Sequence, residues 1–190
     1  MRNGREIVVD AAPAADERAV RLSILGPAFS QLLDQRGFLV LHASAVDTKE
    51  GVAAFLGASG SGKSTLAAAF HRKGSAFITD NLLAVHFVKN QPCVFPAFPQ
   101  SKLWPNSAAA LGFNFQNLPR IESMAQKRWL CLQDRFVTKP LPLKCLYLLS
   151  KGRQIEISEA TNRQKLLHLI SHSYGNLKNE SGVHRLVRIS

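Results

Sequence analysis

The stretch GASGSGKS, at residues 57–64, constrains the fold of this chain more than any other feature. It matches the G-x-x-x-x-G-K-[ST] pattern of phosphate-binding loops, also called Walker A motifs. Residues 52–56 predict a buried strand before the loop, and residues 65–73 predict a helix after it. Glycines let backbone N–H groups surround phosphate oxygens, and a helix start adds unpaired donors and the positive end of its dipole. The sequence therefore predicts nucleotide binding.

Individual positions of the loop have distinct expected roles. Lys63 is expected to reach the β- and γ-phosphates, and Ser64 is expected to ligate Mg²⁺. The predicted nucleotide-binding residues are Gly57, Ala58, Ser59, Gly60, Ser61, Gly62, Lys63, Ser64 and Thr65.

A further candidate is Asp80, which ends an apolar strand predicted at residues 75–79. An acidic residue at this position can hold Mg²⁺, directly or through water, or accept a proton as a general base. The alternative is a capping or turn aspartate, because Asp-Asn pairs such as Asp80-Asn81 are common in turns. We favour the first interpretation and expect Asp80 to be a metal ligand and catalytic residue.

The segment before the loop indicates the type of sheet. Residues 38–46 predict a strand, and only residues 47–51 separate it from the strand at 52–56. This link is too short for a parallel crossover, so the two strands should form an antiparallel hairpin. We expect an α/β fold with a mixed, largely antiparallel sheet. Further strands are predicted at residues 6–9, 20–24, 82–88, 93–95, 129–132 and 141–149, and helices at 27–36, 106–111 and 161–172.

Length, charge and cysteine usage limit the classes of protein to consider. The 190 residues suit a single domain, 1–190, and the formal charge of +11 is spread along the chain without a block of basic residues. No nucleic-acid-binding motif is visible, so specific nucleic-acid binding is not expected. No apolar run is long enough to cross a membrane, and no signal peptide is apparent. The three scattered cysteines favour a reducing cytoplasm.

The ordered set of motifs resembles the HPr kinase/phosphorylase family, whose catalytic fold is akin to that of PEP carboxykinase. The matching segments are residues 41–46, 57–65, 72–74 and 78–80. The chain is more similar to a branch of stand-alone HPr-kinase-like serine kinases, some of which phosphorylate lasso-peptide precursors. That likeness is carried by residues 42–46, 102–107, 127–128, 139–143 and 172–175. The resemblance covers about residues 26–175, which leaves N-terminal strands at 1–25 and a short, divergent tail at 176–190.

This resemblance implies an ATP-dependent, Mg²⁺-dependent kinase that transfers the γ-phosphoryl group to a Ser or Thr hydroxyl of a peptide or protein. It implies catalytic roles for Lys63, Asp80 and His42, the last of which matches a family histidine near the phosphates. From the sequence alone, a single histidine on an apolar strand such as His42 is more often a core residue with its hydrogen bonds satisfied, so the site role rests on the resemblance. Asn81, Lys127 and Arg128 are candidate contacts to phosphate or substrate, and the alternative for the two cations is a solvated position. Family members form ring oligomers, so a homo-oligomer is left open.

Three departures from the family pattern keep other functions open. Asn81 stands where the family commonly has a second aspartate, and the E-x-R-G-L-G-like segment of phosphorylase chemistry is missing. The short tail is the third departure. Phosphorylase activity is therefore not expected. The alternatives are a small-molecule kinase or NTPase on the same scaffold, or a catalytically weak nucleotide-binding regulator.

Overall fold

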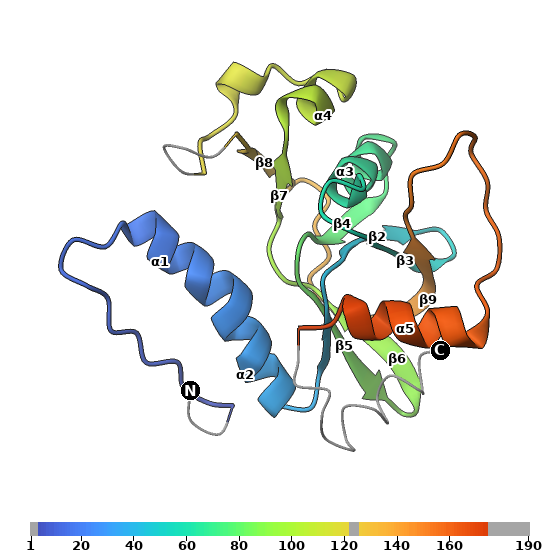
Figure 1. The fold of residues 1–190 in the computed structure, drawn as a ribbon, viewed down its shortest axis with the longest axis horizontal. Coiled ribbons are helices and arrows are strands. Elements are labelled where there is room, and N and C mark those ends of the chain that lie inside the picture. The colour runs from blue at the N-terminus through green and yellow to red at the C-terminus, as the bar shows by residue number, and fades with distance from the viewer. Residues whose placement is uncertain (1–3, 122–125, 175–190) are drawn as a thin grey trace.

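The computed structural model describes residues 4–121 and 126–174 of the chain (Figure 1). Its centre is a seven-stranded sheet in the order β1-β5-β6-β9-β3-β2-β4, and β7 and β8 form a separate two-stranded sheet. The strands are β1 Leu39–Leu41, β2 Ser44–Thr48, β3 Gly51–Leu56, β4 Ala76–Thr79, β5 Leu83–Val88, β6 Gln91–Phe95, β7 Gln100–Leu103, β8 Arg128–Cys131 and β9 Leu141–Leu148. The helices are α1 Glu17–Ser23, α2 Phe29–Gln35, α3 Lys63–Arg72, α4 Pro105–Ala110 and α5 Asn162–Ser171, with a π-helix at Ile24–Ala28 and a 3-10 helix at Phe115–Asn117.

The main sheet is mixed and largely antiparallel, as the sequence predicts. β3 and β9 run parallel, whereas the other neighbouring strands of this sheet pair antiparallel. β2 and β3 form a hairpin whose register places Ser44 opposite Phe55 and Thr48 opposite Gly51. This hairpin delivers the chain directly into the glycine-rich loop after β3.

Two apolar clusters cover the two faces of the β2–β3 hairpin. Ala45, Val52 and Ala54 belong to the cluster that includes Leu169 of α5. The residues that alternate with them, among them Val46 and Phe55, belong to the cluster that includes α3. Successive side chains of a strand point to opposite faces, so burial of both faces explains the unbroken apolar run before the loop.

The strand predicted at residues 38–46 is in fact two strands, because the chain leaves the sheet at His42 and Ala43. β1 pairs with β5, whereas β2 pairs with β3 and β4. At the break, the His42 N–H donates to the His172 carbonyl at 2.6 Å. The predominance of apolar residues in 38–46 concealed the break, which brings His42 beside the segment that follows α5.

The N-terminal strands predicted within residues 1–25 are also wrong. Residues 20–24 lie in α1 and the start of the π-helix. Asp16 caps α1 by accepting the Arg18 N–H at 2.9 Å, and Arg21 pairs with Glu17 one turn away at 2.6 Å. These local interactions favour a helix over a strand. Residues 6–9 form no strand in the described part of the chain, and Val8 and Val9 are exposed.

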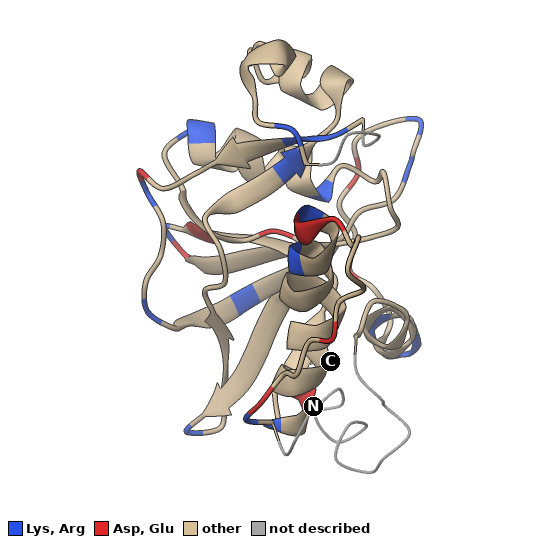
Figure 2. Cartoon of the chain, turned by 90° about the vertical axis from the view of Figure 1, so that its left-hand side faces the viewer, with Lys and Arg blue, Asp and Glu red and all other residues tan. Residues whose placement is uncertain are grey.

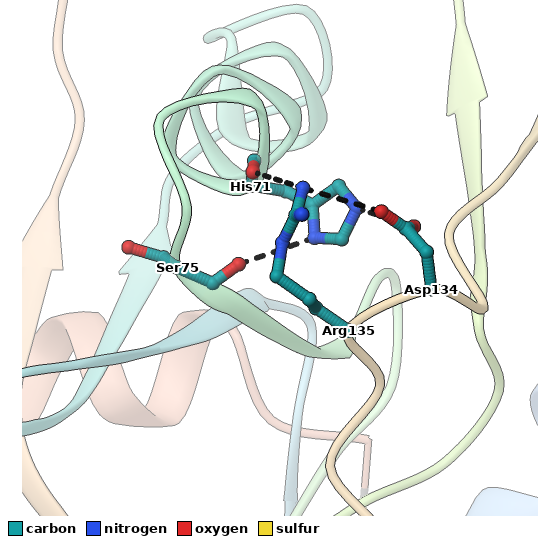
Figure 3. A network of polar contacts seen from close by, with 4 residues as sticks. All are labelled: His71, Ser75, Asp134 and Arg135. Carbon is teal, nitrogen blue, oxygen red and sulfur yellow. Dashed lines mark hydrogen bonds and ion pairs between the residues drawn. The ribbon is translucent and has the colours of Figure 1, made fainter.

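The C-terminal end of α3 is held by a polar network around the buried His71 (Figure 3). The Nδ1 atom of His71 lies 3.2 Å from the Ser75 carbonyl, and its Nε2 atom lies 3.0 Å from the Asp134 carboxylate. Arg135 contacts the same carboxylate at 3.2 Å and donates to the His71 carbonyl at 3.1 Å. This end of the helix is therefore tied to the segment between β8 and β9.

Lys and Arg are distributed over several elements and loops rather than collected on one helix or strand (Figure 2). Among the helices of the described residues, none has the length and apolarity needed to cross a membrane. Gly175 and the predicted divergent tail at 176–190 lie outside the described residues.

Candidate functional site: the pocket at the glycine-rich loop

The glycine-rich loop links the end of β3 to the start of α3, and three of its glycines have positive φ. Gly57, Gly60 and Gly62 have φ values of +145°, +80° and +97°. A Cβ atom on Gly57 would lie 2.7 Å from the Leu149 carbonyl oxygen and 2.7 Å from the Ser61 Oγ atom. Any side chain at position 57 would therefore meet both backbone strain and a steric clash.

Lys63 is the first residue of α3, and its side chain folds back into the loop. The residue is only 7% exposed, and its Nζ atom donates to the carbonyls of Gly57 at 2.7 Å and Ala58 at 3.1 Å. Burial lowers the pKa of Lys63; Asp80 opposes this shift, and Lys127 adds to it. The ammonium group is thus held inside the loop, near the position expected for the β- and γ-phosphates.

Asp80 follows β4, and its carboxylate accepts four hydrogen bonds. The hydroxyls of Ser44 and Ser64 donate to Oδ1 at 2.5 and 2.9 Å. The Ser101 hydroxyl and the Lys102 N–H donate to Oδ2 at 2.8 and 3.1 Å. Asp80 thus joins β2, α3 and β7, and it lies in the pocket of the loop rather than serving as an isolated turn residue.

The oxygen atoms of Ser64 and Asp80 suit a magnesium ion. A hydroxyl and a carboxylate, 2.9 Å apart, are hard oxygen ligands of the kind that Mg²⁺ takes alongside water and phosphate oxygens. The loop also contains an unpaired polar atom, since the buried Oγ of Ser61 has no hydrogen-bond partner among the described residues. A phosphate oxygen would provide that partner. The donor set of the loop therefore fits a magnesium-bound phosphate group.

His42 enters this pocket from the break between β1 and β2. Its Nδ1 atom lies 2.8 Å from the Tyr174 hydroxyl and 3.1 Å from the Asn81 carbonyl. A carbonyl only accepts hydrogen bonds, which assigns the proton of the neutral ring to Nδ1. Burial lowers the pKa of His42, and Lys63 adds to the shift. His42 is therefore favoured as a neutral imidazole with an unprotonated Nε2.

Asn81 shapes the turn that follows Asp80. It has a φ of +82°, in the left-handed region that asparagine tolerates better than most residues. Its carbonyl faces His42, and the residue also lines the pocket of the loop. The contact with His42 uses the main chain and does not depend on the amide side chain.

Two cavities meet at this site and share His42 and Ser59. The first contains the phosphate loop and Asp80, and it is also lined by Lys102, Trp104, Ser107 and Lys127. The second, of about 360 Å³, lies between residues 57–59 and residues 171–174. His42 and Ser59 therefore lie at the boundary between the two cavities.

The structure separates the two adjacent cations Lys127 and Arg128. Lys127 lines the phosphate cavity, and its Nζ atom lies 5.0 Å from the centre of the Trp104 ring. Arg128 instead donates to the Leu118 carbonyl at 2.8 Å and to the Gln116 side chain at 3.1 Å. Arg128 thus fastens the 116–118 segment and does not line the phosphate cavity; its predicted phosphate contact stays a prediction.

Several residues of the site were not predicted from the sequence as site residues. They are Ser44, Ser101, Lys102, Ser107 and Tyr174. For Ser44 the sequence offers one indication, because this residue is polar and lies within an apolar strand. Tyr174 lies 132 positions from His42, so local patterns could not place the two side chains together.

Comparison with known proteins shows a partial structural similarity. No family model matches it, and no curated protein matches it. Among solved structures, it is similar in part to the Hpr(Ser) kinase/phosphatase from Coxiella burnetii. That match has 15% identity and a TM-score of 0.42, and it covers 62% of this chain and 69% of the other. At this level of similarity, the match assigns neither a family nor a function.

Proposed function

We propose that this protein is an ATP-dependent phosphotransferase that transfers the γ-phosphoryl group to a Ser or Thr hydroxyl of a peptide or protein. The observation that carries the proposal is the hydrogen bond of 2.9 Å between Ser64, in the first turn of α3, and Asp80, at the end of β4. Together with Lys63, these residues place a hydroxyl, a carboxylate and an ammonium group around one phosphate loop. This is the set of groups that phosphoryl transfer requires.

The residues of the loop would hold the nucleotide and stabilise the charge that develops during transfer. Backbone N–H groups of the loop would bind the phosphates, and Lys63 would leave its carbonyl partners to contact the β- and γ-phosphates. Mg²⁺, held by Ser64 and Asp80, would neutralise charge on the β- and γ-phosphate oxygens. Positioning and electrostatic stabilisation supply most of the catalysis in reactions of this class.

During transfer, the acceptor oxygen forms a bond to the γ-phosphorus, and the bond from that phosphorus to the bridging oxygen of ADP breaks. The acceptor hydroxyl must also lose its proton. Two groups of the site can accept it, the carboxylate of Asp80 and the Nε2 atom of His42. The hydrogen bonds to Tyr174 and Asn81 fix the orientation of the His42 ring.

The second cavity has room for an acceptor larger than a water molecule. Hydrolysis needs space for one water molecule, whereas the cavity between residues 57–59 and 171–174 measures about 360 Å³. Its wall includes the polar residues Ser171, His172 and Ser173, and it opens at His42. A side chain that carries a hydroxyl could reach the site from this direction.

Product analysis with γ-labelled ATP tests the proposal. The full chain would be incubated with Mg²⁺ and with peptides that contain Ser or Thr, and with matched peptides that contain Ala. We expect label on the hydroxyl peptides alone. Lys63→Ala should abolish transfer, whereas Lys73→Ala, which changes an exposed lysine at the other end of α3, should retain it.

Other products would contradict the proposal in distinct ways. Free phosphate without a labelled peptide would indicate an NTPase. Label on a small-molecule hydroxyl would indicate a small-molecule kinase. ATP binding without turnover would indicate a nucleotide-binding regulator, and recovery of activity in Asn81→Asp would then identify residue 81 as the cause.

A further inference from the structure

A large aromatic side chain is exposed in the cavity that contains the phosphate loop. Trp104 is the N-cap residue of α4, and it lines the same cavity as Lys63 and Asp80. It remains 42% exposed, although burial of its ring would be favourable. An exposed indole within a polar cavity is available to stack on a flat ligand group.

Two sets of hydrogen bonds hold the segment around Trp104 against the phosphate loop. On one side, the Thr65 hydroxyl donates to the Ser107 hydroxyl at 2.8 Å and so links the first turn of α3 to α4. On the other side, the hydroxyl of Ser101 and the N–H of Lys102 bind the Asp80 carboxylate. Trp104 lies between these attachments in sequence, so its position relative to the loop is constrained.

The groups of the loop indicate the direction in which a bound nucleotide would run. Lys63, Ser64 and Asp80 mark the end for the β- and γ-phosphates and the metal. The α-phosphate would lie toward the next N–H groups of the helix start, at Thr65. Beyond Thr65, the cavity wall continues to Ser107 and Trp104. The nucleoside would therefore leave the loop on the side of Trp104.

From this geometry we propose that the indole of Trp104 is the platform on which the nucleobase stacks. This inference rests on the proposed function, because it requires a nucleotide at the loop. Stacking on an indole accepts any base, since each base has a π-face. The platform therefore supplies affinity for nucleoside triphosphates in general, and ATP and GTP should both use it.

Lys127 gives the platform a second component. Its Nζ atom lies 5.0 Å from the Trp104 ring centre, so the ammonium group contacts the π-system. Lys127 also contributes to lowering the pKa of Lys63, which places it near the phosphate position. On nucleotide binding, the Lys127 ammonium would move from the indole to the phosphate oxygens and free the ring for the base.

The experiment compares a ligand that has a base with one that lacks it. Dissociation constants for Mg·ATP and for magnesium tripolyphosphate would be measured on the wild type, Trp104→Ala, Trp104→Phe and Trp129→Phe. Trp129 is a matched control, since it also contacts a lysine, Lys102 at 5.1 Å, but does not line the cavity. Loss of one base stack weakens binding by about 5- to 150-fold.

We expect Trp104→Ala to weaken ATP binding by the factor expected for loss of one base stack and to leave tripolyphosphate binding unchanged. Unchanged tripolyphosphate binding would also show that the phosphate site is intact. Trp104→Phe should recover most of the affinity, and Trp129→Phe should match the wild type. In Trp129→Phe, Trp104 is the sole tryptophan, and ATP should quench its fluorescence.

Three results would overturn the inference. Unchanged ATP affinity in Trp104→Ala would show that the base lies elsewhere. Equal weakening of ATP and tripolyphosphate would show that Trp104 only supports the fold of the loop. Failure of the wild type to bind ATP would overturn both the proposed function and the stacking platform. The first two results would overturn the platform alone.

Discussion

At the scale of single residues, Asp80 connects elements that are far apart in the sequence. Its two carboxylate oxygens accept hydrogen bonds from Ser44, Ser64, Ser101 and the Lys102 N–H. Three of these donors are side-chain hydroxyls, which can rotate away when a metal ion approaches. The carboxylate is therefore fixed in position and still able to exchange partners on ligand binding.

His42 should make the stability of the protein depend on pH. Its pKa is lowered in the folded state, mainly by burial, from a value of about 6.5 in the unfolded chain. Between these two pKa values the unfolded state binds more protons, so the free energy of unfolding should fall as pH falls below about 6.5. Urea denaturation at pH 5 to 8 measures this dependence.

The matched variant His42→Asn should lose this part of the pH dependence, and Tyr174→Phe should retain it. A pH profile of His42→Asn that is identical to that of the wild type would show that other groups cause the dependence.

Gly57 should be the glycine of the loop that tolerates substitution least. Gly57→Ala combines a positive φ with Cβ contacts of 2.7 Å, and it should lower the free energy of unfolding by about 2–5 kcal/mol. Gly60→Ala is the control, because its Cβ would have no neighbour within 4 Å. It should cost only the backbone strain, about 1–2 kcal/mol. Equal losses in chemical denaturation would refute this distinction.

At the scale of elements, the sequence predicts the helices and strands that are determined by residues close together in the chain. The strand, glycine loop and helix at β3 and α3 follow from consecutive residues, and so does Asp80 at the end of β4. The break between β1 and β2 could not be predicted, because it results from pairing with two different partners. The error at α1 arose because its apolar residues also fit a strand, and the helix depends on Asp16 and the Glu17–Arg21 pair.

The His71 network should contribute to the attachment of α3. His71→Ala removes contacts to Ser75 and Asp134 and leaves a buried gap, so the free energy of unfolding should fall by about 1–3 kcal/mol. Asp134→Asn should have a smaller effect, because an amide oxygen can still accept from His71. Urea denaturation of both variants would test this order, and an unchanged midpoint for His71→Ala would contradict it.

At the scale of the whole molecule, the site is an assembly of distant segments around one local motif. The glycine-rich loop and Asp80 could be placed from the sequence. Other walls of the two cavities come from residues 102–107, 127 and 171–174. Their positions depend on the two-stranded β7–β8 sheet and on the segment after α5, which pairs with β1 through Leu41 and Ser173. Such contacts leave no periodic pattern in the sequence.

The proposed function depends on one property, that Lys63, Ser64 and Asp80 together hold a magnesium-bound nucleotide. Calorimetric titration of the full chain with ATP, in excess Mg²⁺ and again in excess EDTA, measures this property most directly. We predict binding of one nucleotide per chain that weakens strongly without Mg²⁺, is lost in Lys63→Ala and persists in Lys73→Ala. Absence of binding to the wild type, or equal binding by the two lysine variants, would contradict the proposed site.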